Sequence, residues 1–174
     1  MQLTNLKFER KLCLLFIAYY LLSFSAKAQE EKPRWLLGTG ITYCSYINNP
    51  GLNLNVTYRI VGNLHIGPDF SALLTSEREE NGRLVKRKEL EYNFNSQYLF
   101  PIGKKVEVYP LVGINWSNVT NHPSGQEAVT ELVTALNLGG GVEIEIRNIR
   151  LFFESKWVSQ LNKYDLTTGI LFTL

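Results

Sequence analysis

The stretch 88–100, "KELEYNFNSQYLF", decides the fold class, because apolar and polar side chains alternate along most of it. Leucine and aromatic residues occupy the even positions from Leu90 to Phe100, apart from Ser96, and glutamate and amide residues occupy the odd positions from Glu89 to Gln97. Successive side chains of a β-strand point to opposite faces. The stretch therefore predicts a strand with one apolar, aromatic face and one acidic and amide face.

Seven further segments show the same alternation, and after residue 28 no helical period of about 3.6 residues stands out. With the opening stretch, the predicted strands are residues 34–46, 51–60, 63–74, 88–100, 105–117, 132–146, 149–159 and 164–174. An even number of antiparallel strands, each close to the ~9–11 residues that cross a bilayer at a tilt, is typical of a transmembrane barrel. We therefore predict an all-β fold, an eight-stranded antiparallel up-and-down transmembrane β-barrel.

The connections between the predicted strands alternate in length. Tight connections are predicted at residues 61–63, 101–104 and 147–148. Long polar connections are predicted at the opposite rim, at residues 75–87 and 118–131, and the shorter connections at residues 47–50 and 160–163 lie on the same side. Short turns at one rim and longer loops at the other are typical of outer-membrane barrels.

The N-terminal segment has the layout of a secretory signal peptide. Lys7, Arg10 and Lys11 precede the apolar run "LCLLFIAYYLLSF", and the small residues Ala26 and Ala28 follow it. The run is short for a membrane helix, which needs ~20 residues. We predict cleavage after Ala28, with an uncleaved membrane anchor as the alternative. The predicted organisation is a signal peptide at residues 1–28, a short extension at residues 29–33 and the barrel at residues 34–174.

The charge of the predicted mature chain argues against nucleic acid as a partner. The full chain has 18 Lys and Arg, 16 Asp and Glu and a sequence pI of about 8.5. The first 28 residues contain four basic residues and one acidic residue, so 14 basic and 15 acidic residues remain after cleavage. No basic surface for nucleic acid remains. Cys44 is the one cysteine left, so no internal disulfide is predicted.

The alternation alone does not decide which face points outward. A soluble eight-stranded barrel such as a lipocalin also alternates, with its apolar face around a ligand cavity. Here the apolar face is bulky and aromatic on nearly every strand, and it would overfill so narrow an interior. The polar face combines glycine and small polar residues with charges of both signs, which suits a narrow, closed lumen. We therefore expect the apolar face to point into lipid.

Two sets of side chains follow from this orientation. Aromatic girdles at the membrane interfaces are predicted near the strand ends, at Trp35, Tyr43, Tyr58, Phe100, Trp116, Trp157, Tyr164 and Phe172. Inside the lumen, three basic residues, Arg59, Arg150 and Lys156, are expected to neutralise Glu89, Glu91, Glu107, Glu143, Glu145 and Glu154.

Three stretches carry a family resemblance. They are "YPLVGINWSNV" at 109–119, "LNLGGGVEIEI" at 136–146 followed by a two-residue turn and "IRLFFESKWV", and the terminal "LTTGILFTL" at 166–174. The chain resembles the small eight-stranded outer-membrane barrels of the OmpA, OmpX and OmpW type, and looks most like the "outer membrane protein beta-barrel domain" proteins. The resemblance covers residues 34–174 and implies a location in the bacterial outer membrane.

In the family that the chain resembles, the last strand carries a signal that the barrel assembly machinery reads during insertion. Tyr164, Leu166, Ile170 and Phe172 match its alternating hydrophobic residues. The family signal usually ends in an aromatic residue, whereas this sequence ends in Leu174. The resemblance therefore implies an atypical insertion signal.

Paired carboxylates are the first candidate for chemistry. Glu143 and Glu145 lie two residues apart on one strand face, ~7 Å apart at the usual rise. They could form a general acid–base pair. Ion pairing with Arg150 and Lys156 on the neighbouring strand is the interpretation that we favour.

Histidine offers two further candidates. His65 shares the inward face with Asp69, but a metal site needs more ligands, so we expect a hydrogen bond in the core. His122, Ser124 and Glu127, in "NHPSGQE", could form a hydrolase triad. A single surface loop seldom holds triad geometry rigidly. The sequence therefore predicts no catalytic, cofactor-binding or metal-binding residues and no cofactor.

The favoured function is that of a small, non-catalytic outer-membrane barrel with a structural, adhesive or interaction role. Its expected partners are outer-membrane lipid, the barrel assembly machinery and an extracellular ligand at loops 75–87 and 118–131. Two alternatives stay open: a soluble, calycin-like carrier of an apolar ligand, and an outer-membrane enzyme that modifies lipid.

Overall fold

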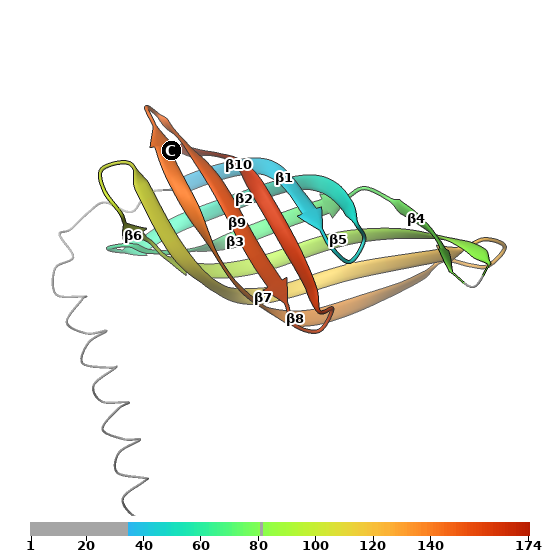
Figure 1. Ribbon diagram of the computed structural model, residues 1–174. Coiled ribbons are helices and arrows are strands. Elements are labelled where there is room, and N and C mark those ends of the chain that lie inside the picture. Colours follow the sequence, from blue (N-terminus) through green and yellow to red (C-terminus); the bar gives the residue numbers. More distant parts are fainter. Residues whose placement is uncertain (1–34, 81) are drawn as a thin grey trace, which may run out of the picture. The chain divides into compact units, whose positions relative to one another are not determined.

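The computed structural model describes residues 35–80 and 82–174, so the predicted signal peptide and the extension at residues 29–33 lie outside the described residues. The described residues form an all-β barrel (Figure 1). Its strands are β1 (Trp35–Cys44), β2 (Asn49–Val61), β3 (Leu64–Leu73), β4 (Ser76–Glu80), β5 (Arg83–Tyr98), β6 (Phe100–Pro101), β7 (Val106–Pro123), β8 (Val129–Ile146), β9 (Ile149–Val158) and β10 (Lys163–Thr173). No helix in these ranges is long and apolar enough to cross a membrane.

The wall of the barrel closes through its first and last strands. Each wall strand pairs antiparallel with its neighbours, and β5 pairs directly with β7. Strands β1 and β10 pair from Leu36 opposite Thr173 to Cys44 opposite Asp165. Strands β4 and β6 are short additions to this wall. The predicted eight-stranded antiparallel barrel is therefore confirmed.

The alternation of polar and apolar side chains that residues 88–100 predicted is observed in strand β5. Glu89 and Glu91 are 0% and 1% exposed and point into the lumen, whereas Tyr92 and Phe94 are each 46% exposed on the outer surface. β5 runs from Arg83 to Tyr98, so it begins and ends earlier than the strand predicted at residues 88–100. The face assignment of every named residue in this strand is unaffected by the shift of its ends.

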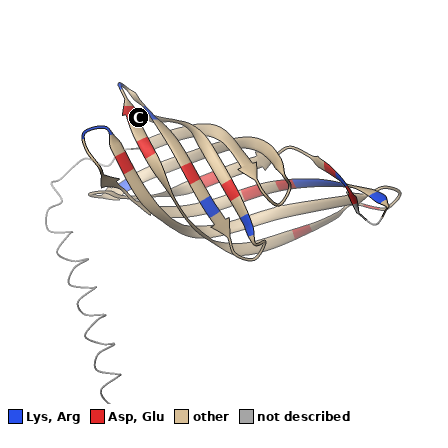
Figure 2. Ribbon diagram, viewed as in Figure 1, with Lys and Arg blue, Asp and Glu red and all other residues tan. Residues whose placement is uncertain are grey.

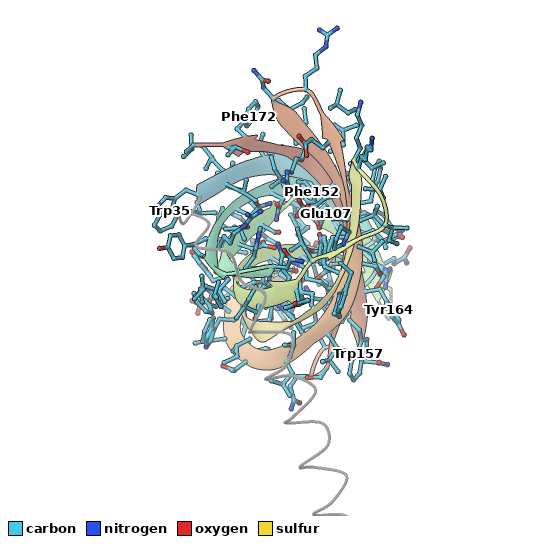
Figure 3. All side chains as sticks on the ribbon, turned by 90° about the vertical axis from the view of Figure 1, so that its left-hand side faces the viewer. Trp35, Glu107, Phe152, Trp157, Tyr164 and Phe172 are labelled. Atoms are coloured by element: carbon cyan, nitrogen blue, oxygen red, sulfur yellow. The ribbon has the colours of Figure 1, made fainter. Side chains whose placement is uncertain are left out.

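The outer surface of the barrel is apolar and aromatic, as expected for a face in lipid. In the view down the barrel, Trp35, Trp157, Tyr164 and Phe172 stand on the outside of the ribbon, while Phe152 lies inside (Figure 3). The rings of Trp35 and Tyr58 are 4.6 Å apart, between their centroids, on neighbouring strands. A carrier of an apolar ligand would need these side chains in its interior, so the soluble alternative is excluded.

The two long loops of the prediction are mostly strands, which corrects the loop assignment at residues 75–87 and 118–131. β5, β7 and β8 continue beyond the wall, and β4 joins them as a hairpin with β5 (Figure 1). Together they form a four-stranded sheet, here called the protruding sheet, made of residues 76–80, 83–88, 118–123 and 129–135. Charged and polar residues there indicated loops, but the backbone groups of these segments pair with one another across strands.

A local signal for this sheet is present in the sequence. Asn81-Gly82 separates the charged runs 76–80, "SEREE", and 83–88, "RLVKRK", and an Asn-Gly pair is a strong signal for a tight hairpin. Gly82 has a positive φ of 74°, a conformation that glycine adopts without strain. Gly82 lies in the turn that leads into β5.

The orientation of the apolar face gives a testable prediction. Arginine in place of Leu54, which is 54% exposed in mid-strand, should lower the free energy of unfolding in lipid bilayers by about 2–4 kcal/mol, because a charge would enter hydrocarbon. Leu132→Arg is the matched control, because Leu132 is 64% exposed on the protruding sheet and should tolerate the charge. Urea titration in vesicles measures both. Equal effects at the two positions would contradict the membrane orientation.

Candidate functional site

Amide side chains from four wall strands meet in the centre of the lumen. Asn93 on β5 accepts hydrogen bonds from Asn115 and Asn137, with N–O distances of 2.8 Å in both cases. Asn53 on β2 donates to Asp69 at 2.8 Å, and Asn93 donates to the same oxygen at 3.4 Å. Each side chain lies on an inward position of its strand. The network therefore ties strands on opposite sides of the barrel to one another.

A buried ion pair lies next to these amides. The Lys156 ammonium is 2.7 Å from a carboxylate oxygen of Asp69 and 3.5 Å from one of Glu154. The Tyr109 hydroxyl donates to the other oxygen of Glu154 at 3.0 Å. We expected Lys156 to pair with Glu143 and Glu145, but its partners are Asp69 and Glu154. The expected neutralisation of Glu154 is confirmed.

Arg150 forms ion pairs with three glutamates near the tight turns. Its guanidinium nitrogens lie 2.5 Å from Glu107, 3.1 Å from Glu143 and 3.9 Å from Glu145. Figure 3 shows Glu107 inside the barrel. The predicted pairing of Glu143 and Glu145 with Arg150 is therefore confirmed. Both carboxylates face one guanidinium, which offsets part of their charge.

His65 makes the core hydrogen bond that was predicted, although its partner is not Asp69. The Arg59 Nε donates to His65 Nε2 at 3.2 Å, and His65 is 1% exposed. Asp69 is instead held by Lys156 and by Asn53. The sequence placed His65 and Asp69 on one strand face, and both do point inward, but they belong to different clusters.

The three residues considered for a hydrolase triad do not come together. His122 lies at the end of β7 and is exposed, as are Ser124 and Glu127 in the turn that follows. The Ser124 hydroxyl donates to the backbone carbonyl of Leu84 at 3.0 Å. Within the described residues no hydrogen bond joins His122, Ser124 and Glu127 to one another. The loop therefore shows no nucleophile activated by a base.

A fourth cluster, here called the Lys163 cluster, lies at the end of the lumen below the protruding sheet. The Lys163 ammonium is 2.7 Å from Glu89, makes a shorter contact with Glu91, and is 3.5 Å from Asp165. The four side chains are at most 1% exposed. Cys44, with a free and fully buried thiol, lies beside Glu89 and Glu91.

Lys163 was not predicted to face the lumen, because residues 160–163 were expected to form a connection. The alternation of the last strand contained the signal: Asp165 and Thr167 face inward, and Lys163 is the next residue of the same parity. Glu89 and Glu91 were expected to pair with Arg59, Arg150 or Lys156, but their partner is Lys163. Cross-strand partners of this kind depend on barrel register, which the local sequence does not encode.

Apolar clusters lie at both ends of this polar interior. Near the tight turns, Leu36, Phe152 and Leu171 pack together. Near the protruding sheet, Cys44 packs with Ile47 and Leu73. An eight-stranded barrel has an interior that side chains just fill. The lumen is therefore a packed core of ion pairs and amides between two apolar layers.

The protruding sheet ends in two strand edges of different character. Figure 2 shows acidic and basic residues on β4 and the adjoining end of β5, whereas the protruding part of β8 carries little charge. β4 pairs with β5 alone, through Glu77, Arg78 and Glu79 among others. β8 pairs with β9 only from Asn137 onward, so within the described residues Val129–Ala135 have a partner strand on one side only.

Comparisons with known proteins agree with the fold. A family model described as "Outer membrane protein beta-barrel domain" matches residues 14–154. No curated protein matches the sequence. Ail of Yersinia pestis, solved with the heparin analogue sucrose octasulfate, has a TM-score of 0.58 at 15% identity, over 82% of this chain and 97% of Ail. The N-terminal barrel of Pseudomonas aeruginosa OprF has a TM-score of 0.58 at 13% identity, over 84% of this chain and 100% of the OprF domain.

A third solved structure, a major outer membrane protein from Thermus thermophilus, has a TM-score of 0.64 at 12% identity, over 83% of this chain and 100% of that one. At these identities the likeness extends to the fold alone. The three structures share the barrel architecture derived above from β1–β10.

The packed lumen predicts that added volume is destabilising. A Cβ on Gly141 would lie 2.5 Å from the Tyr109 ring and 2.6 Å from the Phe153 carbonyl oxygen. Gly141→Val should therefore lower the free energy of unfolding by about 1–3 kcal/mol. Thr168→Val, on the outer face of β10, is the control and should be nearly neutral. Unfolding in urea, followed by tryptophan fluorescence, tests this; an unchanged midpoint for Gly141→Val would indicate a loosely filled lumen.

The Lys163 cluster predicts that removal of a buried lysine costs much more stability than removal of an exposed one. Lys163→Met leaves its carboxylates buried without the ammonium and should cost about 3–5 kcal/mol of stability. Lys86→Met removes a pair with Glu77 at 2.9 Å, but these side chains are 52% and 51% exposed, so about 0–1 kcal/mol is expected. The same unfolding assay compares them. A cost for Lys163→Met no larger than that for Lys86→Met would contradict the assignment.

Proposed function

Because the chain belongs to the family of outer membrane protein beta-barrel domains, we propose that it is a non-catalytic binding protein whose protruding sheet engages an extracellular partner. The protein is an integral β-barrel of the bacterial outer membrane. The proposal includes two further partners: outer-membrane lipid around the wall, and the barrel assembly machinery during insertion.

The position of the protruding sheet supports an extracellular role. It extends from the rim with the longer connections, and in barrels of this layout that rim faces the outside of the cell. The rim with tight turns carries no comparable extension within the described residues. A partner outside the cell would therefore meet the protruding sheet.

The open edge of β8 is the observation that carries the proposal. At the last wall position, the backbone N–H of Leu136 donates to the Ser159 hydroxyl and its carbonyl accepts from the Ser159 N–H, so both groups of Leu136 point away from β7. Backbone groups of alternate residues point to the same side of a strand. Thr134, Leu132 and Thr130 therefore direct an N–H and a carbonyl toward the open edge.

The side chains of this edge favour strand addition. The sequence 129–135, "VTELVTA", is rich in β-branched residues and contains a single charge. Val129 and Leu132 are 57% and 64% exposed. Natural proteins protect exposed edges with charges, as on β4, and an unprotected edge is a template for another strand. We therefore assign the partner strand to β8 and not to β4.

The partner that fits this edge is an extended protein segment, because strand addition uses main-chain hydrogen bonds for affinity and alternate side chains for specificity. A sulfated polysaccharide is the second candidate. Register places Arg78, Arg83 and Arg87 on the inner face of the protruding sheet, and Ail was solved with a heparin analogue. Arginine forms strong charge-assisted hydrogen bonds to anionic oxygens.

The absence of catalysis is part of the proposal. The residues with catalytic potential are either held in ion pairs inside the lumen or, like His122 and Ser124, exposed and apart. A general base must lie within hydrogen-bond reach of the group that it activates. These positions support binding over turnover.

The open edge can be tested with backbone-directed variants. Leu132→Pro with Thr134→Pro removes two edge N–H groups without touching the ladder to β7, whereas Leu132→Val with Thr134→Val keeps them. The probe is a fluorescent peptide of residues 114–121, the segment that pairs with β8 on its other side. We expect saturable binding that is weakened at least about tenfold by the proline pair and retained by the valine pair, because two hydrogen bonds are lost.

The outcomes separate the possible partners. Equal binding by the proline and valine pairs would contradict strand addition at β8. Sedimentation in detergent shows whether a second copy of the chain occupies the edge, as a dimer that the proline pair dissociates. Heparin binding that survives the proline pair and is lost in Arg78→Gln with Arg83→Gln would favour the polysaccharide. Heat-modifiable gel mobility shows that each variant is folded.

A further inference from the structure

The formal charges of the Lys163 cluster do not balance. Three carboxylates, from Glu89, Glu91 and Asp165, surround one ammonium, which leaves a net charge of −2. The side chains are sealed from solvent, and the wall around them faces lipid. Uncompensated buried charge is strongly unfavourable. A further positive charge at this point would reduce the penalty.

Several oxygens of the cluster have no hydrogen-bond partner among the described residues. They are both carboxylate oxygens of Asp165 and the Oε2 of Glu89, all fully buried. The Asp165 side chain is aimed into the cluster, because its Oδ2 lies 3.5 Å from the ammonium that also holds the two glutamates. Buried polar atoms are normally satisfied, so this arrangement points to a ligand.

The thiol of Cys44 faces the same point. Cys44, Glu89 and Glu91 each offer one ligand atom, and these atoms lie within 4.8 Å of one another. The residues come from β1 and β5, and Asp165 comes from β10, which pairs with β1 beside Cys44. The set therefore spans three strands at the root of the protruding sheet. The lumenal clusters around Arg150 and Lys156 contain no thiol.

We propose that Cys44, Glu89 and Glu91 bind a thiophilic divalent cation of the Zn²⁺ type, with Asp165 beside them. Zinc takes thiolate sulfur at ~2.3 Å and carboxylate oxygen at ~2.0–2.2 Å, so the ligand atoms need to close by less than about 1 Å. Ca²⁺ and Mg²⁺ prefer sites built from oxygen alone. The thiol makes Zn²⁺ or Cd²⁺ the better fit.

Charge supports a divalent ion. Metal binding deprotonates the thiol. The cation then adds two positive charges and the thiolate one negative charge, so the net charge of the cluster changes from −2 to −1. Lys163 contacts the Oε1 atoms of Glu89 and Glu91, and the Oε2 of Glu89, which has no hydrogen-bond partner, would be available to the metal. The bound ion would link β1 and β5, independently of any partner at the β8 edge.

Metal binding is tested on protein extracted from outer membranes in detergent and dialysed against a chelator. Cd²⁺ is the first probe, because a thiolate ligand gives it an ultraviolet charge-transfer band, and Zn²⁺ content per chain after dialysis is the second. We expect one ion per chain, no band in Cys44→Ser, and affinity at least about tenfold lower in Glu89→Gln. Glu107→Gln, which removes a lumenal carboxylate beside Arg150, is the control and should bind like the wild type.

Three results would overturn the site. They are a folded wild-type protein that gives no Cd²⁺ band, a band of equal strength in Cys44→Ser, and equal loss of affinity in Glu107→Gln and Glu89→Gln. Either of the last two would mean an adventitious ion only. If Cys44→Ser does not fold, as judged by heat-modifiable mobility, the wild-type band together with Glu89→Gln decides the question. Peptide binding at the β8 edge does not enter this test.

Discussion

The pairing of every backbone N–H and carbonyl within the wall is the constraint on which the rest of this structure depends. In hydrocarbon no water can satisfy these groups, and a closed sheet satisfies all of them internally. The ladder between β1 and β10 supplies the closure. Once the wall is closed, its residues have two environments, lipid outside and a narrow lumen inside. The strict alternation of bulky apolar and polar residues follows from these two environments.

The same constraint explains why the protruding sheet can keep open edges whereas the wall cannot. Beyond the lipid, water can satisfy backbone groups, so β4 and the ends of β5, β7 and β8 can form an open sheet with free edges. Inside the wall, charges must instead be satisfied by one another, as around Arg150, Lys156 and Lys163. The interaction surface and the sealed core are thus two responses to one requirement, applied on either side of the membrane interface.

The sequence predicts the strands of the wall and the face on which each side chain lies, but not which side chains pair across strands. The parity of Glu89, Glu91, Tyr92 and Phe94 predicted their faces correctly, because one strand needs no knowledge of its neighbours. The partners of those glutamates were predicted incorrectly, because Lys163 reaches them from a strand more than seventy positions away, a register effect. Residues 75–87 and 118–131 were likewise predicted to be loops. Their pairing with one another, and not their composition, makes them strands.

The ladder that joins β1 to β10 also sets a temporal order for folding. Leu36 pairs with Thr173, and the N–H of Leu174 donates to the Trp35 carbonyl at 2.9 Å. One edge of β1 therefore remains unpaired until β10, the last strand of the chain, has reached the membrane. Contacts of such large sequence separation form slowly, because the loop must close before they contribute. A nascent chain that stalls before β10 would hold an open edge in contact with lipid or with whatever chaperone shields it.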